Sequence, residues 1–237
     1  MRLHRTMCVN YTTVKRHGLE RFNVEAPQQD WVDEIWQDYI APIIVSDQRG
    51  HRLALLASYG MVPQARIAPG VKKFSTMNAR SETVGSLRSF CTPWRQGQRC
   101  LVPMQRYFEP NYESGKSVRW AIGLKDQPEF AVAGLWRAHD NKDGTVSHSF
   151  TQLTVNADEH PLLCRFHKPG DEKRGLVILR PEDYDDWLSC SDPEQSRLLL
   201  GLRPAEEMTA VPAPQPPRQP KAGKVNPSPK PENLSLF

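Results

Sequence analysis

The chain has 237 residues, of which 38% are hydrophobic and 24% are charged, and its formal net charge is +4 at pH 7. This composition supports one folded domain with an added tail, and no apolar run is long enough to cross a membrane as a helix. The cysteines show neither close pairing nor zinc-type spacing, which excludes a disulfide framework and predicts no metal site and no cofactor. We expect a soluble, cytoplasmic protein that is by default a monomer, and the mild positive charge is compatible with a nucleic-acid partner.

The amino-terminal residues 1–7 form a basic leader that lacks the apolar segment of a secretory signal. Cys8 becomes the terminal residue if Met7 is the true start and is then removed, which we favour, or if the leader is cut away. A terminal cysteine offers an α-amine and a thiol that are both usable near neutral pH. The amine can form an imine with an aldehyde, and the thiol can close on that imine to give a thiazolidine. No internal cysteine can do this, because its nitrogen is an amide.

The next elements combine helices and strands. Apolar spacing predicts a helix at 31–40, and residues 81–90, which open with Ser-Glu, predict a second. Short runs rich in β-branched or aromatic residues predict buried strands at 53–57, 100–103, 120–124 and 130–136.

Further strands are predicted at 150–155 and 176–179, and Asn-Lys-Asp-Gly at 141–144 predicts a hairpin before the first of these. Pro181 and Asp192 are suited to begin two short helices, since proline fits a first turn and aspartate caps it. Strands outnumber helices and do not alternate with them. The sequence therefore indicates an α+β or mostly β fold with a strongly curved, mostly antiparallel sheet.

From residue 208 onward the sequence becomes proline-rich and basic, with Arg218, Lys221, Lys224 and Lys230 between the prolines. Such a composition is typical of an extended tail. We place the folded domain at residues 8–207 and the tail at 208–237. The tail is a candidate docking segment for replication-associated proteins.

Two motifs bring polar residues beside predicted elements. Asn78 and Arg80 directly precede the helix expected at 81–90, so Asn78 is either a helix cap or part of a phosphate site formed by the helix start and Arg80. Glu109 follows two aromatic residues, and a carboxylate lodged against them would have a raised pKa, as a general acid requires. An exposed charge at a strand end is the alternative interpretation of Glu109.

A polar loop near residue 170 carries the histidine candidates. His167 lies between Arg165 and Lys168 in the sequence. A histidine with basic neighbours suits acid/base chemistry beside a phosphate, and the alternative interpretation is a solvated basic loop. His160 is a rival for the same role.

Taken together and in this order, the motifs resemble the SRAP family, the SOS-response-associated peptidases or abasic-site processing proteins. The shared features are the Met-Cys pair at 7–8, Asn-Ala-Arg-Ser-Glu-Thr at 78–83, Tyr-Phe-Glu at 107–109, Thr154, and the loop from His167 to Arg174. The resemblance implies a single compact α+β domain around a curved, barrel-like sheet, with a positively charged cleft for single-stranded DNA.

The resemblance also implies an activity. The protein would sense abasic sites in single-stranded DNA and trap the ring-opened aldehyde as a thiazolidine through Cys8, which shields the lesion. Associated AP-lyase cleavage and autoproteolysis that exposes the cysteine belong to the same expectation. Asn78 would orient the linked sugar, Glu109 would move protons, and His167 would act on the opened sugar and help reverse the link.

The implied DNA contacts are the flanking phosphates, bound by Arg80 and Arg174, and the site itself, positioned with the help of Thr154. The chain departs from the family pattern in three places. Cys-Val-Asn at 8–10 replaces Cys-Gly-Arg, so one phosphate-binding arginine is missing, and Pro110 replaces a tryptophan after the glutamate. Residues 168–173 form an insertion between His167 and Arg174.

Two other functions remain open from the sequence. A cysteine peptidase acting on other proteins would pair a thiolate with His167 and would not need a free amino terminus. A non-catalytic nucleic-acid-binding module would bind DNA without any covalent product.

Overall fold

One long strand, β6 (Arg99–Asn111), organises the structure because it pairs with β1, β3, β7 and β8. The structure is a computed structural model that describes residues 10–47 and 49–215. The other strands are β1 (Tyr11–Thr13), β2 (Glu34–Ile35), β3 (Ile40–Ser46), β4 (Arg52–Tyr59), β5 (Asn78–Arg80), β7 (Val118–Leu124), β8 (Phe130–Asp140), β9 (Val146–Asn156), β10 (Arg174–Leu176) and β11 (Met208–Pro212). The helices are α1 (Cys91–Arg95), α2 (Tyr184–Ser189) and α3 (Pro193–Arg197), with short 3-10 turns η1 (Arg16–Phe22), η2 (Gln64–Arg66), η3 (Leu163–Arg165), η4 (Pro181–Asp183) and η5 (Ala205–Glu207).

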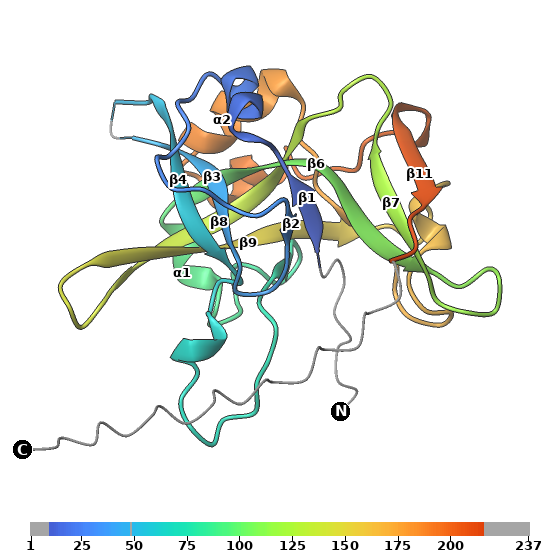
Figure 1. Cartoon of the computed structure of the whole chain (residues 1–237), viewed down its shortest axis with the longest axis horizontal. Helices are drawn as coiled ribbons and strands as arrows, with labels where there is room; N and C mark the ends of the chain where they lie inside the picture. The colour runs from blue at the N-terminus through green and yellow to red at the C-terminus, as the bar shows by residue number, and fades with distance from the viewer. Residues whose placement is uncertain (1–9, 48, 216–237) are drawn as a thin grey trace, which may run out of the picture.

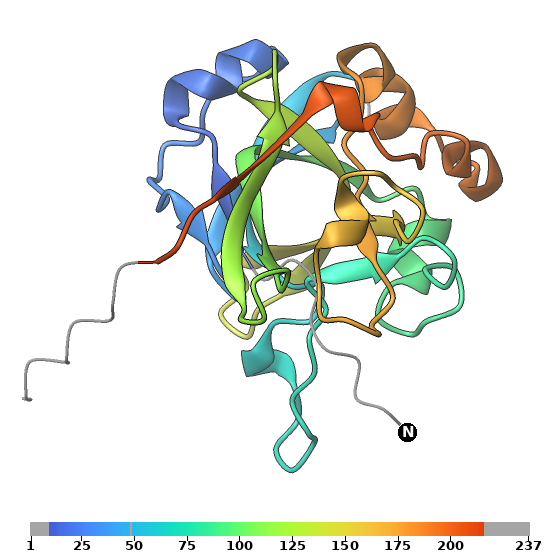
Figure 2. The same cartoon turned by 90° about the vertical axis from the view of Figure 1, so that its right-hand side faces the viewer.

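The strand pairings close into a barrel. β3 pairs with β4, β4 with β9, β9 with β8, β8 with β6, and β6 returns to β3. All of these pairings are antiparallel except β4 with β9. Figures 1 and 2 show the resulting curved sheet with the short helices outside it. The fold is thus a single, mostly β domain, as the sequence predicted.

Residues of the barrel strands alternate between two apolar clusters. On β6, Cys100, Val102 and Met104 join a cluster fed by every barrel strand, while Leu101 joins a second cluster with Trp94 of α1 and Trp187 of α2. This alternation follows from the two-residue period of a strand. The first cluster therefore fills the barrel, and the second packs the helices against its outer face.

Gly134 of β8 permits close packing against the neighbouring strands β6 and β9. A Cβ added at Gly134 would lie 2.8 Å from Cys100 Sγ and 2.8 Å from the carbonyl oxygen of Thr151. Only glycine fits between two strands that approach so closely.

The strands expected at 53–57, 100–103, 120–124, 130–136 and 150–155 are present, and so is the turn at 141–144 between β8 and β9. The strand expected at 176–179 is displaced, since β10 covers Arg174–Leu176 and Ile178 forms only an isolated bridge with Val132. There the amide of Asn141 donates to the carbonyl of Thr145 at 2.9 Å, and Gly144 has φ +81°. The expected helices beginning at Pro181 and Asp192 are confirmed, and the Asp192 carboxylate accepts from the amide of Glu194 as a cap.

The expected helix at 31–40 is wrong. The segment instead contains β2, a turn with Asp38 at φ +65°, and the start of β3. Val32 is 54% exposed and Tyr39 48% exposed, while Ile35 is buried, so the apolar residues do not share one buried face. The apolar residues have helical spacing in the sequence only because β2, the turn at Asp38 and the start of β3 follow one another closely.

The expected helix at 81–90 is also wrong. Residues after β5 form successive turns, in which the amide of Thr83 donates to the carbonyl of Arg80 and the amide of Leu87 donates to the carbonyl of Thr83. The helix α1 begins only at Cys91. Gly85 lies in the middle of this segment and weakens a helix there.

The domain boundary expected after residue 207 is too early. Met208–Pro212 form β11, which pairs along β7 from Leu124 to Trp120 (Figure 2). Residues 216–237 of the expected tail lie outside the described residues. Within the part that is described, no helix has the length and apolar character needed to span a membrane.

Candidate active site

Glu109 and His167 meet in the structure although they are 58 positions apart in the sequence. Glu109 lies on β6 opposite Trp120 of β7, and its side chain is only 5% exposed. His167 is 7% exposed, and its Nδ1 lies 3.4 Å from Glu109 Oε2. Glu109 is therefore a buried carboxylate beside a histidine, and the interpretation as an exposed strand-end charge is wrong.

The backbone fixes His167 in this position. Its amide donates to the carbonyl of Pro110, the residue next to Glu109, at 2.9 Å. His167 also has φ +63°, in the left-handed region that histidine adopts more readily than most residues. Backbone strain of this kind is common at functional sites.

The hydrogen bond of His167 Nε2 shows which ring nitrogen carries a hydrogen. His167 Nε2 lies 3.0 Å from the carbonyl oxygen of Arg174. A carbonyl only accepts, so Nε2 must carry a hydrogen. Nδ1 then faces the Glu109 carboxyl, 3.4 Å from Oε2. A ring nitrogen placed beside a buried carboxyl group suits proton transfer to or from a substrate.

His160 has a different role. Its Nε2 lies 2.9 Å from the carbonyl of Arg203, and its Nδ1 accepts from the amides of Leu162 and Leu163 at 3.2 and 3.0 Å. Both ring nitrogens are committed to backbone groups, so His160 stabilises the loop. The geometry favours His167 over His160 for acid/base chemistry.

Arg174 lies at the start of β10, and its side chain is 1% exposed. Its guanidinium makes a two-bond contact with Glu82 at 2.8 Å for each bond, and it also bonds Glu172 at 2.9 Å. The same group donates to the carbonyl of Thr154 at 2.7 Å. Thr154 is itself buried, and its hydroxyl lies 3.4 Å from the carbonyl of Ala79.

Arg80 shares one of these carboxylates, since its Nη1 lies 2.5 Å from Glu172 Oε2. Burial opposes ionisation of Glu82 and of Glu172, but hydrogen bonds from Arg174, and for Glu172 also from Arg80, outweigh it and lower both pKa values. Both arginines expected to bind phosphates are therefore paired with carboxylates in this structure.

Asn78 and Arg80 lie on β5 rather than before a helix. In the parallel pairing of β5 with β9, Asn78 faces Gln152 and Arg80 faces Thr154. Thr154 also pairs with Leu176 of β10, so β9 separates Asn78 and Arg80 from Arg174. The interpretation as a helix-start phosphate site is wrong, but the motif residues do gather around one strand.

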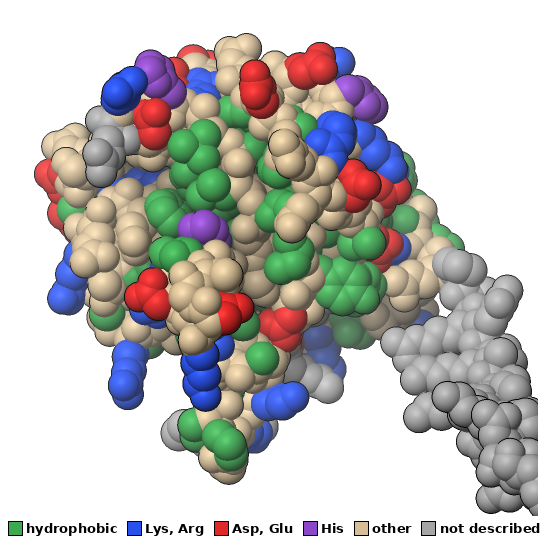
Figure 3. Space-filling view, turned by 60° about the vertical axis from the view of Figure 1, so that its left-hand side comes forward, with side chains coloured by type: hydrophobic (Ala, Val, Ile, Leu, Met, Phe, Trp, Pro, Cys, Tyr) green, Lys and Arg blue, Asp and Glu red, His purple; other side chains and the backbone are tan. Residues whose placement is uncertain are grey.

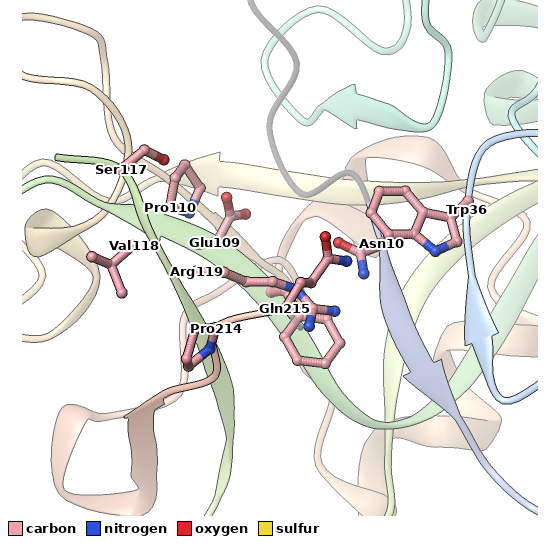
Figure 4. A pocket seen from close by; sticks show the side chains of 10 residues that line it. Asn10, Trp36, Glu109, Pro110, Ser117, Val118, Arg119, Pro214 and Gln215 are labelled. Atoms are coloured by element: carbon pink, nitrogen blue, oxygen red, sulfur yellow. The ribbon is translucent and has the colours of Figure 1, made fainter. Parts of the chain in front are cut away.

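A cavity of about 500 Å³ adjoins Glu109. It is lined by Asn10, Trp36, Phe108, Glu109, Pro110, Ser117, Val118, Arg119, Pro214 and Gln215 (Figure 4). Cys8 lies outside the described residues, but Asn10 is only two positions from it and is buried against Phe108, whose amide donates to the Asn10 carbonyl at 3.2 Å.

Arg119 is a cavity residue that the sequence interpretation missed. It lies on β7 opposite Pro110, and its Nη2 bonds Glu34 Oε1 at 2.7 Å. Nothing in the local sequence of β7 marks it. The available signal was the asparagine at position 10, where the family pattern has an arginine.

A second surface feature is the loop between η2 and β5, which projects from the barrel (Figure 1). It carries Lys72 and Lys73 beside Val71 and Phe74, which are 52% and 44% exposed. Figure 3 shows Lys and Arg side chains along this edge with apolar side chains at the tip.

Known proteins of similar sequence include several abasic site processing proteins. The family described as "SOS response associated peptidase (SRAP)" matches residues 7–215. YobE of Bacillus subtilis (strain 168), named an abasic site processing protein, is 28% identical over an alignment of 215 residues, and the match covers 86% of this chain and 93% of that protein. The abasic site processing protein HMCES of Pongo abelii is 23% identical over an alignment of 182 residues, and the match covers 64% of this chain and 49% of that protein.

Solved structures share the fold. A crystal structure of a protein from Bordetella bronchiseptica has a TM-score of 0.78 and 30% identity, covering 88% of this chain and 100% of that one. A protein from Bacteroides thetaiotaomicron, at 23% identity, has a TM-score of 0.68 and covers 86% of this chain and 91% of its own.

Proposed function

The chain belongs to the SOS response associated peptidase (SRAP) family, and from that premise we propose that it processes abasic sites in single-stranded DNA by forming a thiazolidine link through Cys8. The observation that carries the proposal is the buried Glu109–His167 pair beside a cavity that Asn10 also lines. Relatives named abasic site processing proteins support the substrate class.

Chain connectivity supports a role for Cys8 at this cavity. Two residues of extended chain span at most ~7 Å, and Asn10, two positions after Cys8, lines the same cavity as Glu109. The proposal therefore assigns the terminal amine and thiol of position 8 to the proton-transfer pair Glu109 and His167.

The chemistry balances with one water lost. The α-nitrogen of Cys8 adds to the aldehyde carbon of the ring-opened deoxyribose, and protonation of the resulting hydroxyl lets it leave as water, which gives the imine. The sulfur then adds to the same carbon while its proton passes to nitrogen, closing the ring. The Glu109–His167 pair supplies the proton to the departing hydroxyl and removes one from the amine.

The remaining motif residues act on the DNA. Asn78 orients the linked sugar, and Thr154 helps position the site from β9, between the strands that carry Arg80 and Arg174. Arg80 and Arg174 bind flanking phosphates when these replace the carboxylates of Glu172 and Glu82 as ion-pair partners. The imine is also the intermediate from which β-elimination would cut the strand, giving AP-lyase activity, and removal of residues 1–7 by autoproteolysis or by an aminopeptidase after a Met7 start exposes Cys8.

Denaturing gels test the proposal. Protein beginning at Cys8 is incubated with a single-stranded oligonucleotide that carries one abasic site, beside the Cys8→Ser variant and protein that retains residues 1–7. We expect a shifted band for the first protein alone, and a shortened oligonucleotide if the lyase reaction competes. Equal cross-linking by the protein with an intact leader would refute the terminal-amine chemistry, and equal cross-linking by Cys8→Ser would exclude the thiol.

A further inference from the structure

A second charged cluster shares the cavity with Glu109. The amide nitrogen of Asn10 donates to Glu34 Oε1, and Arg119 bonds the same oxygen at 2.7 Å. Arg119 and Glu34 are only partly exposed, at 20% and 36%. Figure 4 shows the Arg119 side chain lying between Glu109 and Gln215 at the cavity wall.

Arg119 lies over an aromatic ring. Its guanidinium carbon is 3.3 Å from the centroid of the Phe108 ring, and Phe108 is the residue before Glu109. A cation over an aromatic face is attracted to it. The ring contact and the bond to Glu34 together hold the guanidinium at the cavity wall.

Within residues 10–47 and 49–215, Glu34 is the one carboxylate that bonds Arg119, and Asn10 shares it. The Nε–H is buried and has no hydrogen-bond partner among these residues, while the side chain as a whole is 20% exposed and lines the cavity. Because the arginine fork matches phosphate oxygens, the exposed part of the guanidinium favours an anionic ligand in the cavity.

We propose that Arg119 binds a backbone phosphate of the DNA strand next to the sugar that Cys8 traps. The inference rests on the proposed function, and it assigns to Arg119 the phosphate contact that Asn10 cannot make. Position 10 is asparagine where the family pattern has a phosphate-binding arginine, and here the cation comes from β7 instead. Glu34 fixes Arg119 and at the same time competes with the phosphate for it.

Binding without chemistry isolates this contact. The probe is a single-stranded oligonucleotide with one tetrahydrofuran, an abasic analogue that has no aldehyde, and its affinity is measured by fluorescence anisotropy at several salt concentrations. We expect Arg119→Met to weaken binding roughly tenfold and to reduce the slope of log affinity against log salt by about 1. Arg119→Lys should recover part of the loss, and Glu34→Gln should bind more tightly than the unaltered protein.

Arg180→Met is the matched control, because Arg180 pairs with Glu207 at 3.0 Å and does not line the cavity. It should leave affinity and slope nearly unchanged. A purely structural Arg119 would instead lower the melting temperature and leave the salt slope intact, and Glu34→Gln would then fail to tighten binding. Either result overturns the inference. Failure of the proposed function is distinguishable, since the unaltered protein would then not cross-link aldehyde-bearing DNA at all.

Discussion

We expect Glu109 and His167 to act as a unit because Glu109 Oε2 and His167 Nδ1 lie 3.4 Å apart in a buried site. Their mutual position depends on two backbone carbonyls, those of Pro110 and Arg174, which accept from the amide and the Nε2–H of His167. A change in either side chain therefore removes proton transfer without removing the cavity.

Glu109→Gln tests this unit, because an amide has nearly the same shape as the carboxyl but neither gives nor takes a proton. We expect the cross-linking rate to fall by about 10²- to 10⁴-fold, the usual contribution of general acid–base catalysis. Affinity for tetrahydrofuran-containing DNA should stay within about twofold, a margin that is small beside a hydrogen bond to a charged group. An unchanged cross-linking rate would remove Glu109 from the mechanism.

The two histidines provide a matched pair of variants. His167→Gln should slow cross-linking strongly, whereas His160→Gln should lower the melting temperature because it breaks contacts with Leu162, Leu163 and Arg203. Rates are compared per folded protein by quenched gel time courses. Slower cross-linking by His160→Gln alone would reverse the assignment.

Sequence reasoning reached some of these residues and missed others for identifiable reasons. The aromatic neighbours of Glu109 correctly indicated burial. That His167 would face it depends on a left-handed backbone and on Pro110, and no local pattern announces such a long-range contact. Arg174 was expected to be available for phosphates, but β5 and β10 flank β9 and bring Glu82 to it, which only the strand pairing reveals.

At the level of elements, the loop at 168–173 acts on both arginines of the motif. It ends beside β10 and carries Glu172, which bonds both Arg80 and Arg174. The loop thus supplies a carboxylate where a DNA phosphate would bind. The Glu172 carboxylate attracts the two arginines strongly at this distance, so it competes with an incoming phosphate for them.

Glu172→Gln is expected to tighten single-stranded DNA binding several-fold at low salt and to steepen its salt dependence, since Arg80 becomes available for a phosphate. Asp171→Asn is the control, because it makes the same charge change in the same loop, and in the described residues the ion-pair partners of Arg80 and Arg174 are Glu172 and Glu82 rather than Asp171. Titrations by anisotropy compare the two. Equal effects of both substitutions would show that only net charge matters.

Elements were predictable where one physical pattern dominated. The strands were found because alternation and β-branched residues persist along them, and the helices at Pro181 and Asp192 because of their caps. The segments 31–40 and 81–90 failed because short pieces, turned at Asp38 and around Gly85, imitate helical spacing. β11 was missed since Met208–Pro212 borders the proline-rich sequence and gains its order from pairing with β7.

The whole molecule should lose stability on acidification in two stages. Burial, aided by the positive charge of Arg66, Arg137 and His148, lowers the pKa of His139 to about 4 from its usual 6.5. The unfolded chain then binds more protons than the folded one in this window, so stability falls as pH drops from 6.5 to 4.

A second stage follows from carboxylates with lowered pKa values. Hydrogen bonds from Arg165 and Asn111 lower the pKa of Glu113 to about 2 from 4.5, and Glu82 and Glu172 shift in the same direction. Their contribution is present above pH 4.5 and is lost as pH falls toward 2.

Melting temperatures measured from pH 7.5 to 3 check both stages, and His139→Gln should flatten the first. A melting temperature that stays constant between pH 6.5 and 4.5 in the unaltered protein, or that responds identically in His139→Gln, would contradict this assignment.

The most direct measurement of the central claim is the intact mass of the DNA-linked protein. Full-length protein that has undergone its natural amino-terminal processing is cross-linked to an abasic oligonucleotide and analysed by mass spectrometry. The expected adduct has the mass of a chain beginning at Cys8 plus the oligonucleotide minus one water. An adduct whose protein part retains Met7 or any earlier residue would contradict the thiazolidine mechanism.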